Sequence, residues 1–283
     1  IPFNGADVGG FFGSPQHSFI AKWTRLASYA YPFFRNHCIR GADRREPFLF
    51  SGKAFDVAKK AIKERYKLIV FWYTQAYRAH VFGDPISKPL WAVFGEIDSF
   101  HDQFANGLPL MGGESLLVNF NEQKMPPGRW YRLWSGVEKL NGSEISNDDF
   151  IESDDFVLLR GGKILPVYDE IGKSAELTIK NPLTLLIAVD ANEKAEGEMF
   201  IDDGISLDFE NKAVYRKFVY ENGHLTSLSL FDGGDENVPS EIKELLINKV
   251  VIYGARQPVG VDDGLQFSYE NNVIIISDVN CQI

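Results

Sequence analysis

The chain has 283 residues, of which 45% are hydrophobic and 24% charged, and its formal net charge is −10. A chain of this length and composition is globular and can bury the core of one large domain or of two to three smaller ones. No apolar run reaches the ~18 residues that a membrane-spanning helix needs, and the two cysteines, Cys38 and Cys281, exclude a disulfide scaffold and a cysteine-based zinc site.

The charge is unevenly distributed along the chain. Residues 1–95 carry 14 Lys and Arg against 6 Asp and Glu, whereas the remaining residues carry 15 against 33. Two domains with different surfaces explain this asymmetry, and a nucleic-acid patch in the first third is the alternative. Because the basic residues of 53–67 follow a helical pattern whose charged face is solvated, we expect no nucleic-acid partner.

The first predicted element is a strand in residues 1–13, IPFNGADVGGFFG, where a short apolar run ends in a glycine-rich turn around Asp7. The Asp7 carboxylate either bonds backbone N–H groups in the turn or binds a ligand at the C-terminal end of a barrel strand. A strand needs a pairing partner, so we expect further sequence upstream of Ile1.

Two helical segments follow. A helix is predicted over 14–30, because Pro15 suits a first helical turn and Pro32 interrupts the pattern. Apolar residues at steps of three and four predict a long second helix over 54–82, which Gly83 ends.

The segment between these helices holds two polar clusters. In YPFFRNHCIRG, His37 is flanked by Arg35 and Asn36, and the sequence leaves open whether this histidine is functional or a structural hydrogen-bonding group. In GADRREPFLF, the adjacent opposite charges of residues 43–46 predict a local network that locks the loop.

From about residue 88 onward the pattern is that of an all-β region. Short apolar or alternating runs such as SLLVNF, LTLLIAV, LTSLSLF and NKVVIYG are separated by Gly, Asn, Asp and Pro. They predict two β-sandwiches with a boundary near residue 190. The paired acids Asp202 and Asp203 in FIDDGIS invite an acid/base hypothesis, but Asp-Asp-Gly between two strands first predicts a turn.

Seven sequence blocks, in order across nearly the whole chain, resemble glycoside hydrolase family 31, the retaining α-glucosidases. The blocks are GADVGGFFG, YPFFRNH, RREPFLF, FWYTQAYRAH, KPLWAVF, RGGKILPV and FIDDGISLDF. The RREP block after His37 is most similar to the branch of the family that works in the endoplasmic reticulum. The signatures of serine hydrolases, P-loop enzymes, dinucleotide-binding proteins and zinc proteases are absent from the sequence.

The resemblance implies a mixed fold, the C-terminal end of a (β/α)8 TIM barrel followed by two all-β sandwich domains. The expected bounds are 1–87 for the barrel part, 88–190 for a proximal sandwich and 191–283 for a distal sandwich. In the family the nucleophile lies in a WxDMNE-type block and the acid/base in a TGDN-type block, and this sequence contains neither. We therefore expect both catalytic carboxylates upstream, no catalytic residue in this chain, and no activity of the chain alone.

The resemblance also implies roles for the motif residues that this sequence retains. Asp7 would accept hydrogen bonds from glucose hydroxyls in subsite −1, Phe11 would line the same pocket, and His37 would donate to a sugar hydroxyl. Arg35 would support the nucleophile carboxylate electrostatically. A sugar pocket needs an acceptor, a donor and an apolar wall, and these residues supply them.

The expected reaction is two-step retaining hydrolysis of terminal α-linked glucose, without a metal or organic cofactor. The substrate would be an α-glucoside or an N-glycan-type oligosaccharide. The expected location is the lumen of the endoplasmic reticulum, with the cytoplasm as the alternative, and a regulatory β subunit is a candidate partner. A non-catalytic carbohydrate-binding module is the alternative function.

The sequence departs from the family pattern at two places. Lys88-Pro89-Leu90 replaces the usual Arg-Pro-Leu, and the block at residues 102–122, DQFANGLPLMGGESLLVNFNE, is longer than usual and altered. Both departures concern the expected join between the barrel and the proximal sandwich.

Overall fold

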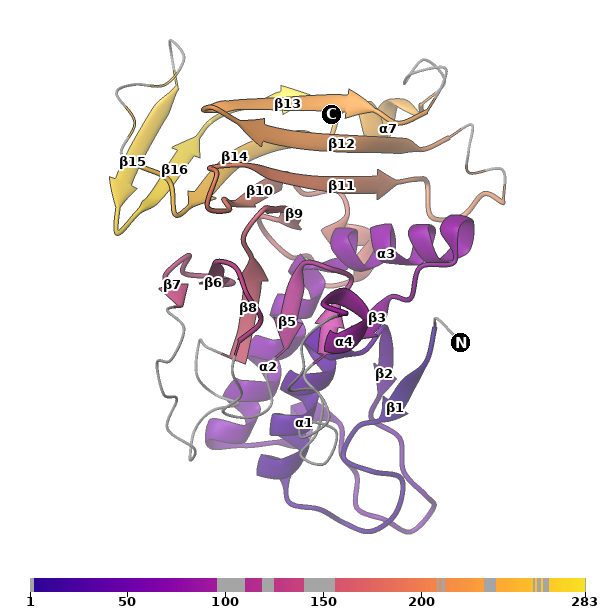
Figure 1. Ribbon diagram of the computed structural model, residues 1–283. Coiled ribbons are helices and arrows are strands. Elements are labelled where there is room, and N and C mark those ends of the chain that lie inside the picture. The colour runs from indigo at the N-terminus through magenta and orange to yellow at the C-terminus, as the bar shows by residue number, and fades with distance from the viewer. Residues whose placement is uncertain are drawn as a thin grey trace. The chain divides into compact units, whose positions relative to one another are not determined.

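The structure is a computed structural model with two compact units (Figure 1). The first unit comprises Ile1–Arg65, Arg78–Pro126 and Asn141–Leu158, and the second comprises Tyr66–Tyr77, Pro127–Leu140 and Leu159–Ile283. The residues described below are 3–95, 110–118, 125–139, 156–207, 209, 212–231, 238–256, 258, 261 and 265–282.

A short parallel strand pair begins the first unit. Strand β1 (Gly5–Asp7) lies beside β2 (Phe33–Arg35), with Gly5 opposite Phe33 and Asp7 opposite Arg35. A Cβ at Gly5 would lie 1.6 Å from the Phe33 carbonyl oxygen, so only glycine permits this approach. Parallel pairing places the carboxyl ends of both strands at the same edge.

Two helices pack around this strand pair. Helix α1 (His17–Ala30) confirms the helix predicted over 14–30, and helix α2 (Gly52–Lys67) follows a 3₁₀ turn at Pro47–Leu49. The buried residues of the unit's core cluster come from both helices, from Phe50 and from the residue directly after β1. This cluster consists of Val8, Ile20, Ala21, Ala27, Phe50 and Ala58.

A buried arginine closes the C-terminal end of α1. Arg65 of α2 donates to the carbonyl oxygens of Ser28, Tyr31 and Pro32 at 3.3, 2.9 and 2.6 Å. Burial lowers the pKa of Arg65 to about 9, which still leaves the guanidinium charged at neutral pH. These bonds fix the chain where α1 leads into β2.

The single helix predicted over 54–82 is wrong, because the chain forms two helices there. Helix α2 ends at Lys67 and α3 (Ile69–Phe82) begins after Leu68, whose side chain is fully buried. The two helices contribute to different cores: Ala58 of α2 belongs to the cluster around β1, whereas Val70 of α3 belongs to the core of the large sheet. The apolar spacing continues across the break, so it does not reveal this change.

The first unit also contains a short antiparallel meander. Strand β3 (Ser87–Pro89) pairs with β4 (Leu110–Gly112), which pairs with β5 (Leu116–Val118), and the one-turn helix α4 (Leu90–Val93) follows β3. The unusual Lys88 thus lies in a strand opposite Met111. Most of the altered block at 102–122 lies outside the described residues.

A nine-stranded sheet dominates the second unit, in the order β13-β12-β11-β9-β10-β14-β16-β15 with β17 also paired to β14 (Figure 1). All neighbouring pairs are antiparallel except β11–β9 and β10–β14. The strands are β9 (Lys163–Tyr168), β10 (Leu183–Ala188), β11 (Ala195–Ile201), β12 (Val214–Glu221), β13 (His224–Ser229), β14 (Leu246–Tyr253), β15 (Gln266–Glu270), β16 (Val273–Ser277) and β17 (Cys281–Gln282).

Shorter elements complete the described chain. The hairpin β6–β7 (Trp130–Arg132 and Glu138–Lys139) and the one-turn helices α6 (Ala175–Thr178) and α7 (Ser240–Lys243) belong to the second unit, whereas β8 (Val157–Arg160) crosses from one unit into the next. The sheet's inner face builds the largest core cluster, which includes Leu185, Ile187 and Ile252.

The sheet continues across residue 190, since β9 and β10 precede this residue and β11–β17 follow it. The boundaries between the two compact units also differ from the expected domain bounds at residues 87 and 190. Those bounds follow the family's domain scheme and stay a prediction. None of the helices in the described part of the chain has the length and apolar character that a bilayer crossing requires.

Candidate functional site

The carboxyl ends of β1 and β2 bring Asp7 and Arg35 together. Arg35 Nε donates to Asp7 Oδ1 at 2.5 Å, and the Val8 backbone N–H donates to the Arg35 carbonyl oxygen at 2.7 Å. The Arg35 side chain is more exposed than that of Asp7, 58% against 22%. The pair is thus an open ion pair at a strand edge, where Asp7 Oδ2 has no hydrogen-bond partner among the described residues.

Phe11 and His37 lie on the two loops that continue from these strands. Their ring centroids are 5.6 Å apart, with the planes inclined by 41°. The Ile39 backbone N–H donates to the Phe11 carbonyl oxygen at 2.9 Å, which holds the two loops side by side. The structure thus brings the four sequence-predicted residues into two neighbouring pairs, one ionic and one aromatic.

Arg45 locks the loop that carries Asp7 and Phe11. Its side chain is almost completely buried and donates to the carbonyl oxygens of Gly9, Gly10 and Gly13, with a distance of 2.7 Å for the last. The charges of residues 43–46 predict a network that locks their own loop, whereas in the structure Arg45 holds the loop after β1. The buried position of one arginine in a charged run could not be recognised from the sequence.

Two glycines allow the tight turn after Asp7. Gly9 and Gly10 have φ values of 91° and 82°, which side chains with a Cβ rarely adopt. The Gly10 backbone N–H donates to the Asp7 carbonyl oxygen at 2.9 Å. The turn therefore rests on backbone bonds, and the Asp7 carboxylate binds Arg35 instead of the turn's N–H groups.

Asn36 is a second residue whose place the sequence did not predict. It lies between Arg35 and His37, and its buried Nδ2 has no hydrogen-bond partner among the described residues. A buried donor without a partner is energetically costly, and burial keeps this Nδ2 out of reach of a ligand in the present conformation.

The acids Asp202 and Asp203 confirm the predicted turn. Asp202 Oδ1 accepts from the Gly204 backbone N–H at 2.8 Å, and Asp203 Oδ1 accepts from the N–H groups of Ile205 and Ser206 at 2.9 and 2.7 Å. Hydrogen bonds from Ser206 hold the pKa of Asp203 at about 2. Asp202 Oδ1 also accepts from the Tyr73 hydroxyl of α3 at 2.7 Å. Both acids are thus engaged in structural hydrogen bonds, which does not support an acid/base pair.

A comparison with known families identifies this part of the chain. Residues 1–75, which contain both residue pairs and Arg45, match the model of the Glycosyl hydrolases family 31 TIM-barrel domain. The resemblance to glycoside hydrolase family 31 is confirmed.

Relatives of this family align along most of the chain. A probable glucan 1,3-alpha-glucosidase of Arabidopsis thaliana is 34% identical over 267 residues, which cover 90% of this chain and 28% of the relative. Neutral alpha-glucosidase AB of Homo sapiens is 32% identical over 92% of this chain and 28% of its own length.

Solved family 31 structures share the fold. The crystal structure of the ER glucosidase II heterodimeric complex, consisting of a catalytic subunit and the binding domain of a regulatory subunit, matches with a TM-score of 0.84 and 25% identity. The match covers 99% of this chain and 33% of that one. The chain therefore spans about a third of the length of the family members it matches, with their mixed α/β fold.

The chemistry of the site is that of polar recognition beside an aromatic wall. Asp7 offers a carboxylate oxygen as acceptor, His37 offers a ring N–H as donor, and Phe11 offers an apolar ring. These groups suit a ligand that carries several hydroxyl groups and an apolar face.

Proposed function

We propose that this chain is the C-terminal part of a retaining α-glucosidase that removes terminal α-linked glucose from glycans or oligosaccharides. The observation that carries the proposal is the meeting of Asp7 with Arg35 and of Phe11 with His37 at the carboxyl ends of two parallel strands, within the family 31 TIM-barrel match. In barrel enzymes this edge carries the active site.

In the proposed site the retained residues bind sugar and do not perform the bond cleavage. Asp7 accepts from glucose hydroxyls, His37 donates to one, and Phe11 covers an apolar face of the ring. Arg35 already bonds one oxygen of Asp7 and adds positive charge next to the site, which stabilises a nearby nucleophile carboxylate.

The two catalytic carboxylates of the proposed enzyme lie outside this chain. Retaining hydrolysis needs a carboxylate nucleophile and a carboxylic acid about 5–5.5 Å apart. In the proposed scheme residues 1–87 complete the barrel, and 88–190 and 191–283 form a proximal and a distal β-sandwich. The relatives' names support the α-glucosidase activity, since the aligned proteins are a glucan 1,3-alpha-glucosidase and neutral alpha-glucosidases.

The matched glucosidase II complex supports a partner and a compartment for the proposed enzyme. That protein is an ER enzyme whose catalytic subunit binds a regulatory subunit. By analogy we place the native polypeptide in the endoplasmic reticulum lumen and give it a regulatory β subunit.

Substitution of Asp7 in the native polypeptide tests the proposal. Asp7→Asn keeps the shape but removes the charge that accepts from sugar hydroxyls, so kcat/KM for an α-glucoside falls about ten- to a hundredfold. His37→Ala lowers it in the same direction. Asp56→Asn, on the exposed side of α2, is the control and leaves kcat/KM unchanged. Unchanged kinetics in the Asp7 and His37 variants would refute the proposed site.

A further inference from the structure

Loops from distant parts of the second unit meet at one end of the nine-stranded sheet. Strands β10 and β14 run parallel, so the chain leaves both at the same edge, after Ala188 and after Tyr253. The β15–β16 turn reaches that edge as well, because Val273 pairs with Tyr253. Arg129 completes the group, since its guanidinium lies between the Asp190 and Gly254 carbonyl oxygens at 3.4 Å from each.

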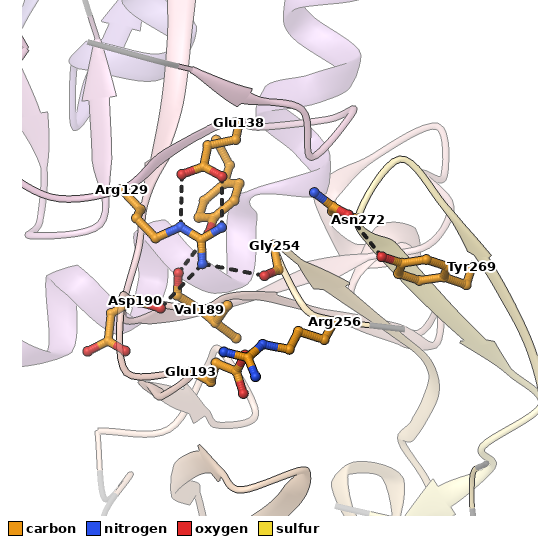
Figure 2. Close-up of polar contacts among 10 residues, drawn as sticks. Arg129, Glu138, Val189, Asp190, Glu193, Gly254, Arg256, Tyr269 and Asn272 are labelled. Carbon is orange, nitrogen blue, oxygen red and sulfur yellow. Dashed lines mark hydrogen bonds and ion pairs between the residues drawn. The ribbon is translucent and has the colours of Figure 1, made fainter. Parts of the chain in front are cut away.

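An open hollow of about 370 Å³ lies among these loops, and its volume is within the usual range of small-molecule sites. Figure 2 shows the polar groups around it. We call this hollow the loop hollow. Its lining includes Arg129, Glu193, Gly254, Arg256, Tyr269 and Asn272.

Local hydrogen bonds hold the walls of the loop hollow in place. Asp190 Oδ1 accepts from the backbone N–H groups of Asn192 and Lys194 at 2.8 and 2.9 Å, which fixes the turn that presents Glu193. On the other side Asn272 has a φ of 62°, the conformation that a tight two-residue hairpin turn requires. The backbone that carries Glu193 and Asn272 is therefore fixed before a ligand binds, which reduces the conformational entropy that binding costs.

Arg129 forms a rigid floor. Its Nε and Nη2 donate to the two carboxylate oxygens of Glu138 at 2.8 and 2.7 Å (Figure 2). Its guanidinium lies over the Tyr131 ring, 5.3 Å from the ring centroid. The ion pair lowers the pKa of Glu138 and raises that of Arg129, so both groups stay charged.

The charges of the loop hollow are balanced. Arg129 is paired with Glu138, and Arg256 Nε donates to Glu193 Oε1 at 2.8 Å. Each guanidinium thus has its own carboxylate, so the site has no surplus positive charge to attract an anion.

Hydrogen-bonding capacity nevertheless remains open. Tyr269 Oη donates to Asn272 Oδ1 at 2.8 Å, which orients the Asn272 amide and leaves its Nδ2 donor without a partner among the described residues. The Arg256 side chain is 89% exposed, so its terminal nitrogens and the second Glu193 oxygen face solvent next to each other. Donors and an acceptor thus alternate around a hollow without net charge.

We infer that the loop hollow binds a neutral saccharide. A sugar hydroxyl both donates and accepts, so adjacent hydroxyls can bond a guanidinium and a carboxylate that are themselves paired. This site shares no residue with the pair Asp7–Arg35 and does not depend on the proposed hydrolase function.

The test uses the native polypeptide with Asp7→Asn, which weakens binding at the barrel site, and follows maltotriose binding by ligand-observed saturation-transfer NMR. We expect binding in this background. Arg256→Ala weakens it about tenfold, and Asn272→Gly, which keeps the positive φ and the charge balance, weakens it about three- to tenfold. Lys217→Ala is the matched control, because Lys217 forms an exposed ion pair with Glu196 at 2.8 Å elsewhere on the same sheet.

Maltotriose binding that neither Arg256→Ala nor Asn272→Gly changes would overturn the inference, as would the absence of maltotriose binding in the Asp7→Asn background. Displacement of maltotriose by millimolar inorganic phosphate would also overturn it, because it would identify an anion site. The outcome is independent of the hydrolysis assay, so failure of the proposed function and failure of this inference are distinguishable.

Discussion

At the residue scale, one buried guanidinium determines the shape of the candidate barrel site. Arg45 bonds three carbonyl oxygens of the loop that follows β1, on either side of Phe11. A lysine can satisfy only part of this set of acceptors, because only arginine carries a planar fork of five donors. The loop's conformation therefore depends on a buried residue outside the loop itself.

We predict that Arg45→Ala lowers the free energy of unfolding by about 3 kcal/mol, because buried carbonyl oxygens lose a charged donor. Arg45→Lys restores part of this loss. Arg44→Ala is the control: Arg44 forms an exposed ion pair with Glu46 at 2.7 Å, and its removal leaves stability unchanged. Equal effects of the two alanine variants in urea denaturation would contradict the role of Arg45 as the lock of the loop.

A pH dependence follows from the Asp203 turn. Hydrogen bonds from the Ser206 hydroxyl and from two backbone N–H groups lower the pKa of Asp203 to about 2 in the folded chain, below the ~3.9 of an unfolded aspartate. A lowered folded-state pKa stabilises the fold above pH ~4, and this contribution disappears as the pH falls from about 4 to about 2.

We therefore expect the Tm difference between the wild-type chain and Asp203→Asn to be largest at neutral pH and to shrink below pH ~4. Ser206→Ala removes one of the donors and reduces the pH dependence of this difference. A Tm difference that is constant from pH 7 to pH 2 would show that the turn does not stabilise the carboxylate.

At the element scale, one hydroxyl connects α3 to the large sheet. Thr74 Oγ1 donates to the Val70 carbonyl oxygen at 2.8 Å and accepts from the Phe200 backbone N–H of β11 at 3.0 Å. Both Thr74 and Phe200 are buried. The helix thus supplies the acceptor that the strand's N–H group would otherwise lack.

Thr74→Val preserves the shape of the side chain but leaves the Phe200 N–H without an acceptor, so the free energy of unfolding falls by about 1–3 kcal/mol. Thr24→Val is the matched control. Thr24 is also buried in a helix, but its hydroxyl only donates to the Ile20 carbonyl oxygen of the same helix. Similar losses for both variants would show that the bond to β11 contributes nothing specific.

A glycine at the end of β14 makes the close packing below the loop hollow possible. Gly254 has a φ of 74°, and a Cβ there would lie 2.1 Å from Tyr131 Oη and 2.7 Å from Arg129 Nη2. We predict that Gly254→Ala costs about 1–3 kcal/mol more than Gly223→Ala. Gly223 shares the positive φ, at 80°, but a Cβ there would touch nothing within 4 Å. Equal Tm losses would contradict a steric role.

Local helices and turns could be predicted from the sequence, whereas the tertiary contacts between them could not. The helix α1 and the turn at Asp202 and Asp203 depend on neighbouring residues, and the sequence predicts both. The break at Leu68 depends on two separate cores, which a continuous apolar pattern does not reveal. The parallel pairing of β10 with β14 brings together loops that are more than 60 residues apart in the sequence. No short stretch of sequence could therefore predict the loop hollow.

The candidate barrel site was only partly predictable for the same reason. The resemblance to family 31 indicated Asp7, Phe11, Arg35 and His37, because their motifs survive in the sequence. The register that sets Asp7 opposite Arg35 is a property of the folded strand pair. No pattern in the sequence indicated that the Arg45 side chain would be buried.

At the scale of the whole molecule, the proposed active site is divided between this chain and further polypeptide. Asp7 is ion-paired with Arg35, and Asp202 and Asp203 accept hydrogen bonds in a turn, which agrees with the proposal that none of these three carboxylates is the nucleophile or the acid. The sequence lacks both blocks that carry the family's catalytic acids. Without a nucleophile and an acid, the two-step retaining mechanism cannot form or release its covalent intermediate.

We therefore predict that the isolated 283-residue chain hydrolyses a chromogenic α-glucoside no faster than buffer, whereas the native polypeptide releases the chromophore. Circular dichroism of the same sample, with a cooperative thermal transition, verifies that the isolated chain is folded. If the folded chain hydrolyses the α-glucoside and Asp7→Asn abolishes this activity, residues of this chain perform the bond cleavage themselves. The division of labour proposed here would then be wrong, because a carboxylate of this chain would have to serve as the nucleophile.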